Sequence, residues 1–269
     1  MKIFDIDRFG KLFCWHWQAS KKQYLVYTIL CTIAFFLPML LTVLPRLKDN
    51  PNYVEGALTT TFVFEHIAFM AMIVVNGAMI QKNLRTKQQR IVFKMLPATD
   101  FEKFIMRYLH VTVGMLAATL LGFVLADLLQ MLICKMAYGQ VLACGTSELW
   151  DAINNLIDFS IGNQKAVSSA TFAITFLLMI HSFYMLGGAF FRKQPVVFTS
   201  LLLMFLCILH LQVIISIDKY DIIALSAVQM QTVLSVIIVI QLAVTAVCYW
   251  LTYLLFKRMQ VINNKWINL

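Results

Sequence analysis

Charged residues are scarce in this sequence. Only 13% of its 269 residues are charged, whereas 61% are hydrophobic, and the mean hydropathy is +0.78. A soluble domain carries about a quarter of its residues as charged side chains, so this composition argues against a soluble globular protein. The sequence also has no internal repeat, low-complexity segment or separate soluble domain. We therefore expect an all-α integral membrane protein with a single transmembrane domain over residues 1–269.

Motifs of common catalytic sites are absent. The sequence has no Gly-x-x-x-x-Gly-Lys-Ser/Thr nucleotide loop, no Gly-x-Ser-x-Gly nucleophile turn and no His-Glu-x-x-His zinc helix. It also has no Cys-x-x-Cys pair. We expect no catalytic, cofactor-binding or metal-binding residue in this chain. If the protein uses ATP, then ATP and Mg²⁺ must bind a partner subunit.

A cleavable signal is missing as well. The first uncharged run covers residues 23–44, which is too long for a typical signal core, and no small-residue cleavage site follows it. We expect this run to stay in the protein as its first membrane span.

Basic residues outnumber acidic ones, and their positions indicate a membrane topology rather than a nucleic-acid surface. The chain has 22 Lys and Arg against 13 Asp and Glu, a formal net charge of +9. Seventeen of the 22 lie in the N-terminal arm, the loop 81–107, the Arg192–Lys193 pair and the C-terminal tail. The positive-inside rule then places both termini and the loop in the cytoplasm. We expect a multi-pass protein of the cell membrane with no nucleic-acid partner.

Six apolar runs are each long enough, at about 1.5 Å per residue, to cross a hydrocarbon core of about 30 Å. Before them, residues 1–22 form an interfacial arm whose apolar residues recur at helical spacing among charges, which predicts an elbow helix. Residues 135–165 show the spacing of a helix on the outer surface, and residues 222–230 predict a further short outer helix. The expected spans are, approximately, 23–44, 58–81, 105–133, 166–190, 195–217 and 231–256.

The longest polar interruption, residues 81–108, is expected to be the cytoplasmic working surface. A thin apolar stripe at helical spacing predicts a short surface helix. Pro97 ends this helix, because proline lacks a backbone N–H and disfavours helix at the residue before it. The stripe is Leu84, Ile91, Val92, Met95 and Leu96, and the basic residues around it are Lys82, Arg85, Lys87, Arg90 and Lys94.

A second helix is expected directly after Pro97. Thr99 and Glu102 have the spacing of a capping box, in which each side chain accepts a hydrogen bond from the other residue's backbone amide. No charge occurs between Arg107 and Asp127, so this helix must continue into the third span. The turn between the helices then acts as a hinge. The alternative is that the basic loop only anchors the protein on anionic lipid.

Five polar side chains inside the predicted spans are further candidates for function. Glu65 and Asp127 lie at comparable heights in the outer halves of their spans. Because a charge in lipid is costly, we expect a functional or paired role, with His66 or a water-filled vestibule as the partner of Glu65. Alternatively, Glu65 lies close enough to the outer surface to be wetted. His181 and His210 are expected to make interhelical hydrogen bonds rather than a metal or proton site.

Cys134 and Cys144 lie together in the predicted outer segments. A disulfide between them would close a loop of about ten residues in an oxidising compartment. Nothing in the sequence fixes the distance between them, so this pairing stays open.

The turn and helix at residues 94–104 also carry a resemblance to a known family. These residues read Lys-Met-Leu-Pro-Ala-Thr-Asp-Phe-Glu-Lys-Phe, which is similar to the Leu-Pro-small-Ser/Thr turn and spanning helix of type-2 ABC exporter permeases. The resemblance covers the whole chain through the elbow helix, the six spans and the cytoplasmic position of both ends. One departure is that many members carry Glu-Arg and Gly-Thr in the first loop helix, where this chain has Asn-Leu-Arg-Thr-Lys at 83–87.

The resemblance implies a permease that forms a homodimer, or pairs with a second permease, in a bacterial cytoplasmic membrane. It implies that a separate cytosolic ATPase subunit docks on the loop and drives a substrate outward. The alternative is a non-transporting membrane scaffold or sensor that uses its basic loop for anionic lipid or a soluble partner. The sequence does not identify the substrate. The expected docking residues are Arg85, Lys87, Arg90, Lys94, Leu96, Pro97, Thr99 and Glu102.

Overall fold

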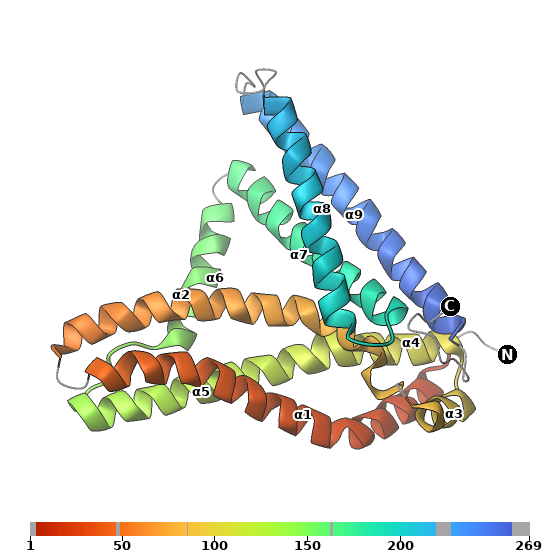
Figure 1. The fold of residues 1–269 in the computed structure, drawn as a ribbon, viewed down its shortest axis with the longest axis horizontal. Coiled ribbons are helices and arrows are strands. Elements are labelled where there is room, and N and C mark those ends of the chain that lie inside the picture. Colours follow the sequence, from red (N-terminus) through yellow and green to blue (C-terminus); the bar gives the residue numbers. More distant parts are fainter. Residues whose placement is uncertain (1–3, 47–48, 85, 162–163, 219–226, 260–269) are drawn as a thin grey trace. The chain divides into compact units, whose positions relative to one another are not determined.

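The computed structural model describes residues 4–46, 49–84, 86–161, 164–218 and 227–259, and helices make up most of these ranges (Figure 1). Within them, five helical stretches are long and apolar enough to cross a membrane. The protein is therefore an all-α, multi-pass membrane protein, as its composition predicts. The five stretches are Ile6–Arg46, Pro51–Lys82, Asp100–Tyr138, Ala170–Phe190 and Gln231–Lys257.

The chain divides into two compact units, which are described separately. The first unit consists of Met1–Phe9, Val74–Tyr108 and Phe159–Leu269. The second unit consists of Gly10–Ile73 and Leu109–Asp158. The loop between the predicted second and third spans lies in the first unit.

In the second unit, α1 (Ile6–Val43), α2 (Pro51–Val75) and α5 (Met115–Tyr138) run alongside one another (Figure 1). Their buried faces meet in two apolar clusters, each of which draws side chains from all three helices. Burial of these apolar side chains joins the three helices, because each cluster needs all of them. The clusters include Phe35, Phe69 and Phe123 in one, and Met39, Phe62 and Cys134 in the other.

One glycine lets two of these helices approach closely. A Cβ on Gly122 of α5 would lie 2.6 Å from the Cβ of Cys31 in α1, which is closer than real side chains come. Small residues at such crossings allow helix backbones to pack tightly in a membrane.

α1 differs from the predicted separation between an elbow helix and a first span. It runs without interruption for 38 residues. Residues 18–23 contain neither proline nor glycine, so nothing there ends the helix before the apolar run begins. The amphipathic arm is therefore the first part of a longer helix. The short helix η1 (Leu44–Arg46) follows it.

The third apolar stretch begins earlier than predicted and contains an irregularity. α4 (Asp100–Leu109) continues through a π-helical segment, η3 (His110–Gly114), into α5. The helix that starts after Pro97 therefore does enter a stretch long enough to span, as the sequence predicts. The division between the two units falls immediately before η3. The predicted helix within residues 135–165 is also present, as α6 (Gly145–Ile161).

The first unit is held together around α7 (Gln164–Phe190). His181 Nδ1 of α7 lies 3.0 Å from the Tyr249 hydroxyl, and Thr175 donates a hydrogen bond to Gln241 Oε1 at 2.5 Å. Both partners belong to α9, so the predicted interhelical hydrogen bonding of His181 is confirmed. Besides α4, the other elements of this unit include η2 (Asn76–Leu84), α3 (Lys87–Met95), α8 (Pro195–Asp218) and α9 (Ala227–Lys257).

α8 covers the predicted fifth span. It packs on α7 through a contact of 2.8 Å between the hydroxyls of Tyr184 and Ser200. The side chain of His210, which is within this helix, lies outside the described residues. Residues 219–226 lie outside them as well, and with them most of the predicted outer helix at 222–230.

Candidate functional site

The loop forms a short surface helix that ends two residues before Pro97. α3 begins at a capping box in which the Gln89 amide donates to Thr86 Oγ1 at 3.3 Å and the Thr86 amide donates to Gln89 Oε1 at 3.2 Å. The helix ends at Met95, and Leu96 is extended, with φ −60° and ψ 135°. Pro97 thus ends the first loop helix as predicted. The Thr86 box was not predicted, although its Thr-x-x-Gln spacing is visible in the sequence.

A second capping box starts α4 on the other side of the turn. The Glu102 amide donates to Thr99 Oγ1 at 3.3 Å, and the Thr99 amide donates to Glu102 Oε2 at 2.9 Å. The predicted box is therefore present, and α4 begins at Asp100. Pro97 and the extended Leu96 fix where α3 ends, and the Thr99 box fixes where α4 starts, so the turn between them has a defined geometry.

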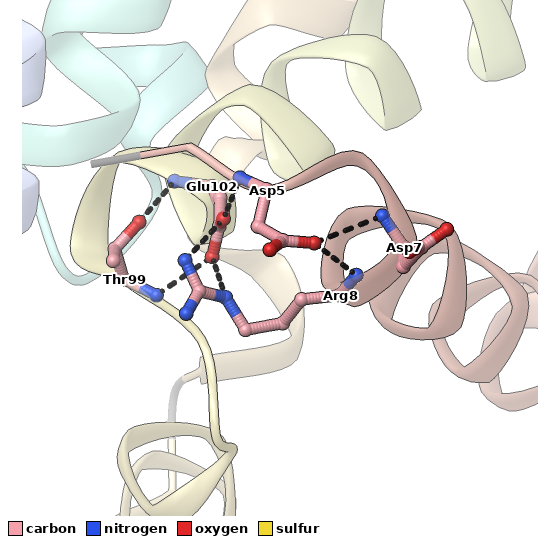
Figure 2. A network of polar contacts seen from close by, with 5 residues as sticks. All are labelled: Asp5, Asp7, Arg8, Thr99 and Glu102. Atoms are coloured by element: carbon pink, nitrogen blue, oxygen red, sulfur yellow. Dashed lines mark hydrogen bonds and ion pairs between the residues drawn. The ribbon is translucent and has the colours of Figure 1, made fainter. Parts of the chain in front are cut away.

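The carboxylate of Glu102 also binds the N-terminal arm (Figure 2). Arg8 donates to it side by side from one edge of its guanidinium, from Nε to Oε2 at 2.8 Å and from Nη2 to Oε1 at 2.7 Å. The Asp5 amide adds a third bond from the arm, to Oε1 at 2.8 Å. With the Thr99 amide, each carboxylate oxygen accepts two hydrogen bonds. Glu102 is fully buried, so this network satisfies a charge that would otherwise be costly to bury.

The arm reaches this position because Asp5 caps the first helix. Its Oδ1 accepts from the amides of Asp7 and Arg8, each at 3.1 Å, which are orphan donors of the first turn of α1 (Figure 2). The cap fixes the start of α1, and Arg8 then projects from a defined turn. Sequence reasoning did not identify this contact, because Arg8 and Glu102 are 94 residues apart and no local pattern links them.

Aromatic side chains attach the two loop helices to the end of α9. Phe93 of α3 meets Phe256 with ring centroids 5.9 Å apart. Phe104 of α4 meets Phe256 and Tyr253 at 5.6 and 5.3 Å, and Phe101 meets Tyr253 at 6.0 Å. We call these five residues the aromatic joint. Both loop helices therefore contact the same spanning helix, one on each side of the hinge.

Cationic side chains add hydrogen bonds and cation–ring contacts at the aromatic joint. Lys103 Nζ donates to the Lys94 carbonyl at 3.0 Å, which closes the turn from α4 back to α3. Lys103 and Arg107 also lie over the Phe93 ring, 5.9 and 5.6 Å from its centroid. Lys94 Nζ in turn donates to the carbonyl of Lys257, the last residue of α9, at 3.4 Å.

The solvent-exposed side of α3 is apolar as well as basic. Ile91, Val92 and Met95 are 39%, 49% and 78% exposed, which is unusual for large hydrophobic residues on a polar loop. Lys87 is exposed beside them. This exposed face of α3 (Lys87, Ile91, Val92 and Met95) carries most of the predicted stripe, while Leu84 of that stripe is buried.

The predicted docking residues occupy several different environments. Pro97 is exposed, and Lys94, Leu96 and Thr99 are partly buried at the turn. Arg90 and Glu102 are buried, at 2% and 0% exposure, so neither presents its charge on the surface. Arg85 lies outside the described residues. Of the predicted basic docking residues that the structure describes, Lys87 is the most accessible, and the docking role of the set stays a prediction.

In the second unit, Asp127 has a structural role that its sequence position did not reveal. Its carboxylate accepts from the Gly145 amide at 2.9 Å, the Thr146 amide at 2.9 Å and the Thr146 hydroxyl at 2.7 Å. These amides are the first of α6, so Asp127 of α5 caps the N-terminus of α6. Cys144 Sγ also contacts this carboxylate at 3.4 Å.

The predicted pairing of Glu65 with His66 is not seen. His66 Nε2 lies 3.2 Å from the Gly145 carbonyl oxygen instead. Glu65 is 3% exposed, and within the described chain neither of its carboxyl oxygens has a hydrogen-bond partner. This burial argues against a carboxyl wetted at the surface of the protein.

The cysteines and histidines do not assemble further sites. Cys134 and Cys144 are both in the thiol form and are not bridged. Across the part of the chain that the structure describes, no three His, Cys, Asp or Glu side chains gather as a metal ion would need.

Comparison of the chain with protein-family models, with curated proteins and with solved structures found no match. The contacts of the loop with the N-terminal arm and with α9 are therefore the basis of the functional proposal.

Proposed function

We propose that this protein is the membrane-spanning permease subunit of an ATP-driven exporter of the type-2 ABC class. The observation that carries the proposal is the arrangement of the loop. An exposed surface helix is joined by a capped proline turn to a spanning helix, and it is packed by aromatic contacts against a second spanning helix. A partner that binds α3 would therefore act on α4 and α9 together.

The exposed face of α3 is the docking surface in this proposal. It combines three large apolar side chains with an exposed lysine, a composition that suits a protein partner with an apolar pocket and an acidic rim. A cytosolic ATPase subunit is the partner that the function requires, because the sequence has no nucleotide-binding motif. ATP and Mg²⁺ bind that subunit.

The rest of the proposal concerns topology and assembly. α8 is the sixth span beside the five stretches with sufficient length and hydropathy, and both termini lie in the cytoplasm with the loop. Two such subunits, identical or paired with a second permease, enclose the path of the substrate in a bacterial cytoplasmic membrane. Substrate moves outward when the two ATPase subunits close.

Docking can be tested by purifying the protein with an ATPase encoded beside its gene. Combining Lys87→Glu with Met95→Glu places two acids on the exposed face of α3 and should abolish co-purification of the ATPase. Lys135→Glu combined with Met136→Glu is the matched control, because Lys135 and Met136 are also an exposed lysine and an exposed methionine, at the other end of the third stretch. If the α3 variant retains the ATPase as well as the control does, docking on α3 is wrong. If the wild-type protein binds no ATPase at all, the scaffold or sensor alternative is favoured.

A further inference from the structure

A small basic pocket lies in the first unit where η2, α3 and the turn between α7 and α8 meet. The space in it that a water-sized group can occupy measures about 10 Å³, which is room for one such group. The whole empty space, including the open mouth, is about 250 Å³. One oxygen of a larger group could therefore enter this space while the remainder of that group occupied the open mouth.

Close packing of backbones shapes this pocket. Gly188 of α7 lines it, and a Cβ there would lie 2.5 Å from the Ala78 carbonyl oxygen of η2. The absence of a side chain brings α7 against η2, so that residues at the ends of both elements face one space. Those residues include Lys82 and Arg192.

The pocket concentrates positive charge. Lys82, Arg90 and Arg192 line it, and none of its lining residues is acidic. Arg90 is only 2% exposed, and its Nε donates to the Leu84 carbonyl at 2.7 Å, which fixes the guanidinium in place. Burial lowers the pKa of Arg90, and repulsion from the like charge of Arg192, which lines the same pocket, lowers it further. An anion between them would relieve this repulsion.

The start of α8 adds to the positive potential. Pro195, the first residue of this 24-residue helix, lines the pocket. The N-terminal end of a helix carries a partial positive charge, which favours an anion near it.

The depth of the pocket in the membrane suggests the kind of anion. Lys82 is the last residue of the apolar stretch Pro51–Lys82, and Arg192 follows Ala170–Phe190 by two residues. The pocket is therefore at the level where two spanning stretches reach the membrane surface, which is the height of lipid headgroups. Phe191 and Pro195 give it an apolar edge beside the three cations. Basic pockets at the ends of spanning helices suit anionic lipid headgroups.

We propose that this pocket binds the phosphate group of an anionic phospholipid. One phosphate oxygen enters the pocket lined by Arg90 and Arg192, and the acyl chains extend along the apolar stretches that end there. Arg90 serves here as a buried lipid ligand rather than as a surface docking charge. The inference is independent of ATP-driven transport, because a scaffold or sensor would contain the same pocket.

The test measures lipid bound to the full-length protein in a nonionic detergent by native mass spectrometry. The probe is phosphatidylglycerol, titrated in parallel with phosphatidylcholine of the same acyl chains. Arg192→Gln and Arg90→Gln should each weaken binding of one phosphatidylglycerol about tenfold, as expected for a charge-assisted contact. Lys193→Gln is the matched control, since Lys193 is an exposed cation in the same turn that does not line the pocket. It should change binding less than about twofold.

Several results would overturn the proposal. Equal losses for Arg192→Gln and Lys193→Gln would show a diffuse charge effect rather than a site. Equal binding of phosphatidylglycerol and phosphatidylcholine would show that the anion is not recognised. If inorganic phosphate at the same concentration displaced the bound phosphatidylglycerol completely, the ligand would be a soluble phosphate rather than a lipid. Should Arg90→Gln fail to fold, Arg192→Gln alone decides, because Arg192 is only partly buried and lies in the turn between two helices.

Discussion

Glu102 is the residue on which the loop depends most. Its buried carboxylate joins the start of α4 to the start of α1 through four hydrogen bonds, two of them from Arg8. Hydrogen bonds to charged groups are stronger than neutral ones, and a buried charge that loses its partner is costly. The side chain of Arg8 remains 22% exposed, so water would recover part of that cost if the pair were broken.

Glu102→Gln should destabilise the protein by about 2 kcal/mol, because the amide cannot accept four hydrogen bonds and carries no charge for Arg8. For a chain of this size, we expect the apparent thermal midpoint in detergent to fall by roughly 4–8 °C. Tryptophan fluorescence during heating provides the measurement.

The matched control for this change is Asp100→Asn, which removes the same charge two residues away. Asp100 is 38% exposed and lies 3.7 Å from Lys94, so this control should cost less than about 0.5 kcal/mol. Adding Arg8→Gln to Glu102→Gln should cause little further loss, since the pair is already broken. Equal midpoints for Glu102→Gln and Asp100→Asn would show that the network does not stabilise the loop.

The same residues show what a sequence can and cannot reveal. Thr99 and Glu102 were predicted as a capping box because the box depends on a spacing of three residues. The bond from Arg8 to Glu102 could not be predicted, because it depends on how distant segments fold together. Arg90 was expected on a basic surface, since charge alone does not show that a side chain is buried. Asp127 was expected to have a functional or paired role, and its partners are the first residues of α6, which no local pattern places beside it.

At the scale of elements, the loop is a hinge between two capped helices. Pro97 removes a backbone donor and holds Leu96 extended, while the boxes at Thr86 and Thr99 set where each helix begins. The aromatic joint then holds both helices against α9. In the proposed function, this local chemistry fixes the direction in which force would pass from α3 to the spans.

Replacing Pro97 and Thr99 by alanine together should let α3 and α4 merge into one helix, because both signals that separate them are removed. Spin labels at positions 88 and 105, in a background without other cysteines, would report the change by electron spin resonance. A continuous helix places these positions about 26 Å apart, at about 1.5 Å per residue. The wild-type hinge should give a shorter distance. An unchanged distance distribution in the double variant would mean that the aromatic joint, not the caps, sets the angle.

At the scale of the whole molecule, composition and apolar runs were sufficient to predict an all-α, multi-pass membrane protein. The starts and ends of elements were less predictable. The elbow and first span are one continuous helix, because no proline or glycine separates them at residues 18–23. The π-helical segment His110–Gly114 has no sequence signal, since it depends on how α4 and α5 each pack. One of the boundaries between the two compact units falls between Tyr108 and Leu109, just before this segment.

The proposed function requires that the loop not only bind the ATPase subunit but also couple its ATP hydrolysis to movement of the spanning helices. The most direct measurement is ATP turnover and substrate export in the same vesicles, reconstituted with the partner ATPase. We predict that the wild-type protein couples the two activities, whereas the Pro97→Ala and Thr99→Ala double variant binds the ATPase and hydrolyses ATP but exports less substrate for each ATP. The spans are untouched in that variant, and only the hinge is altered. If export, turnover and their ratio all stay at wild-type levels, the loop is only an anchor and the proposed coupling is wrong.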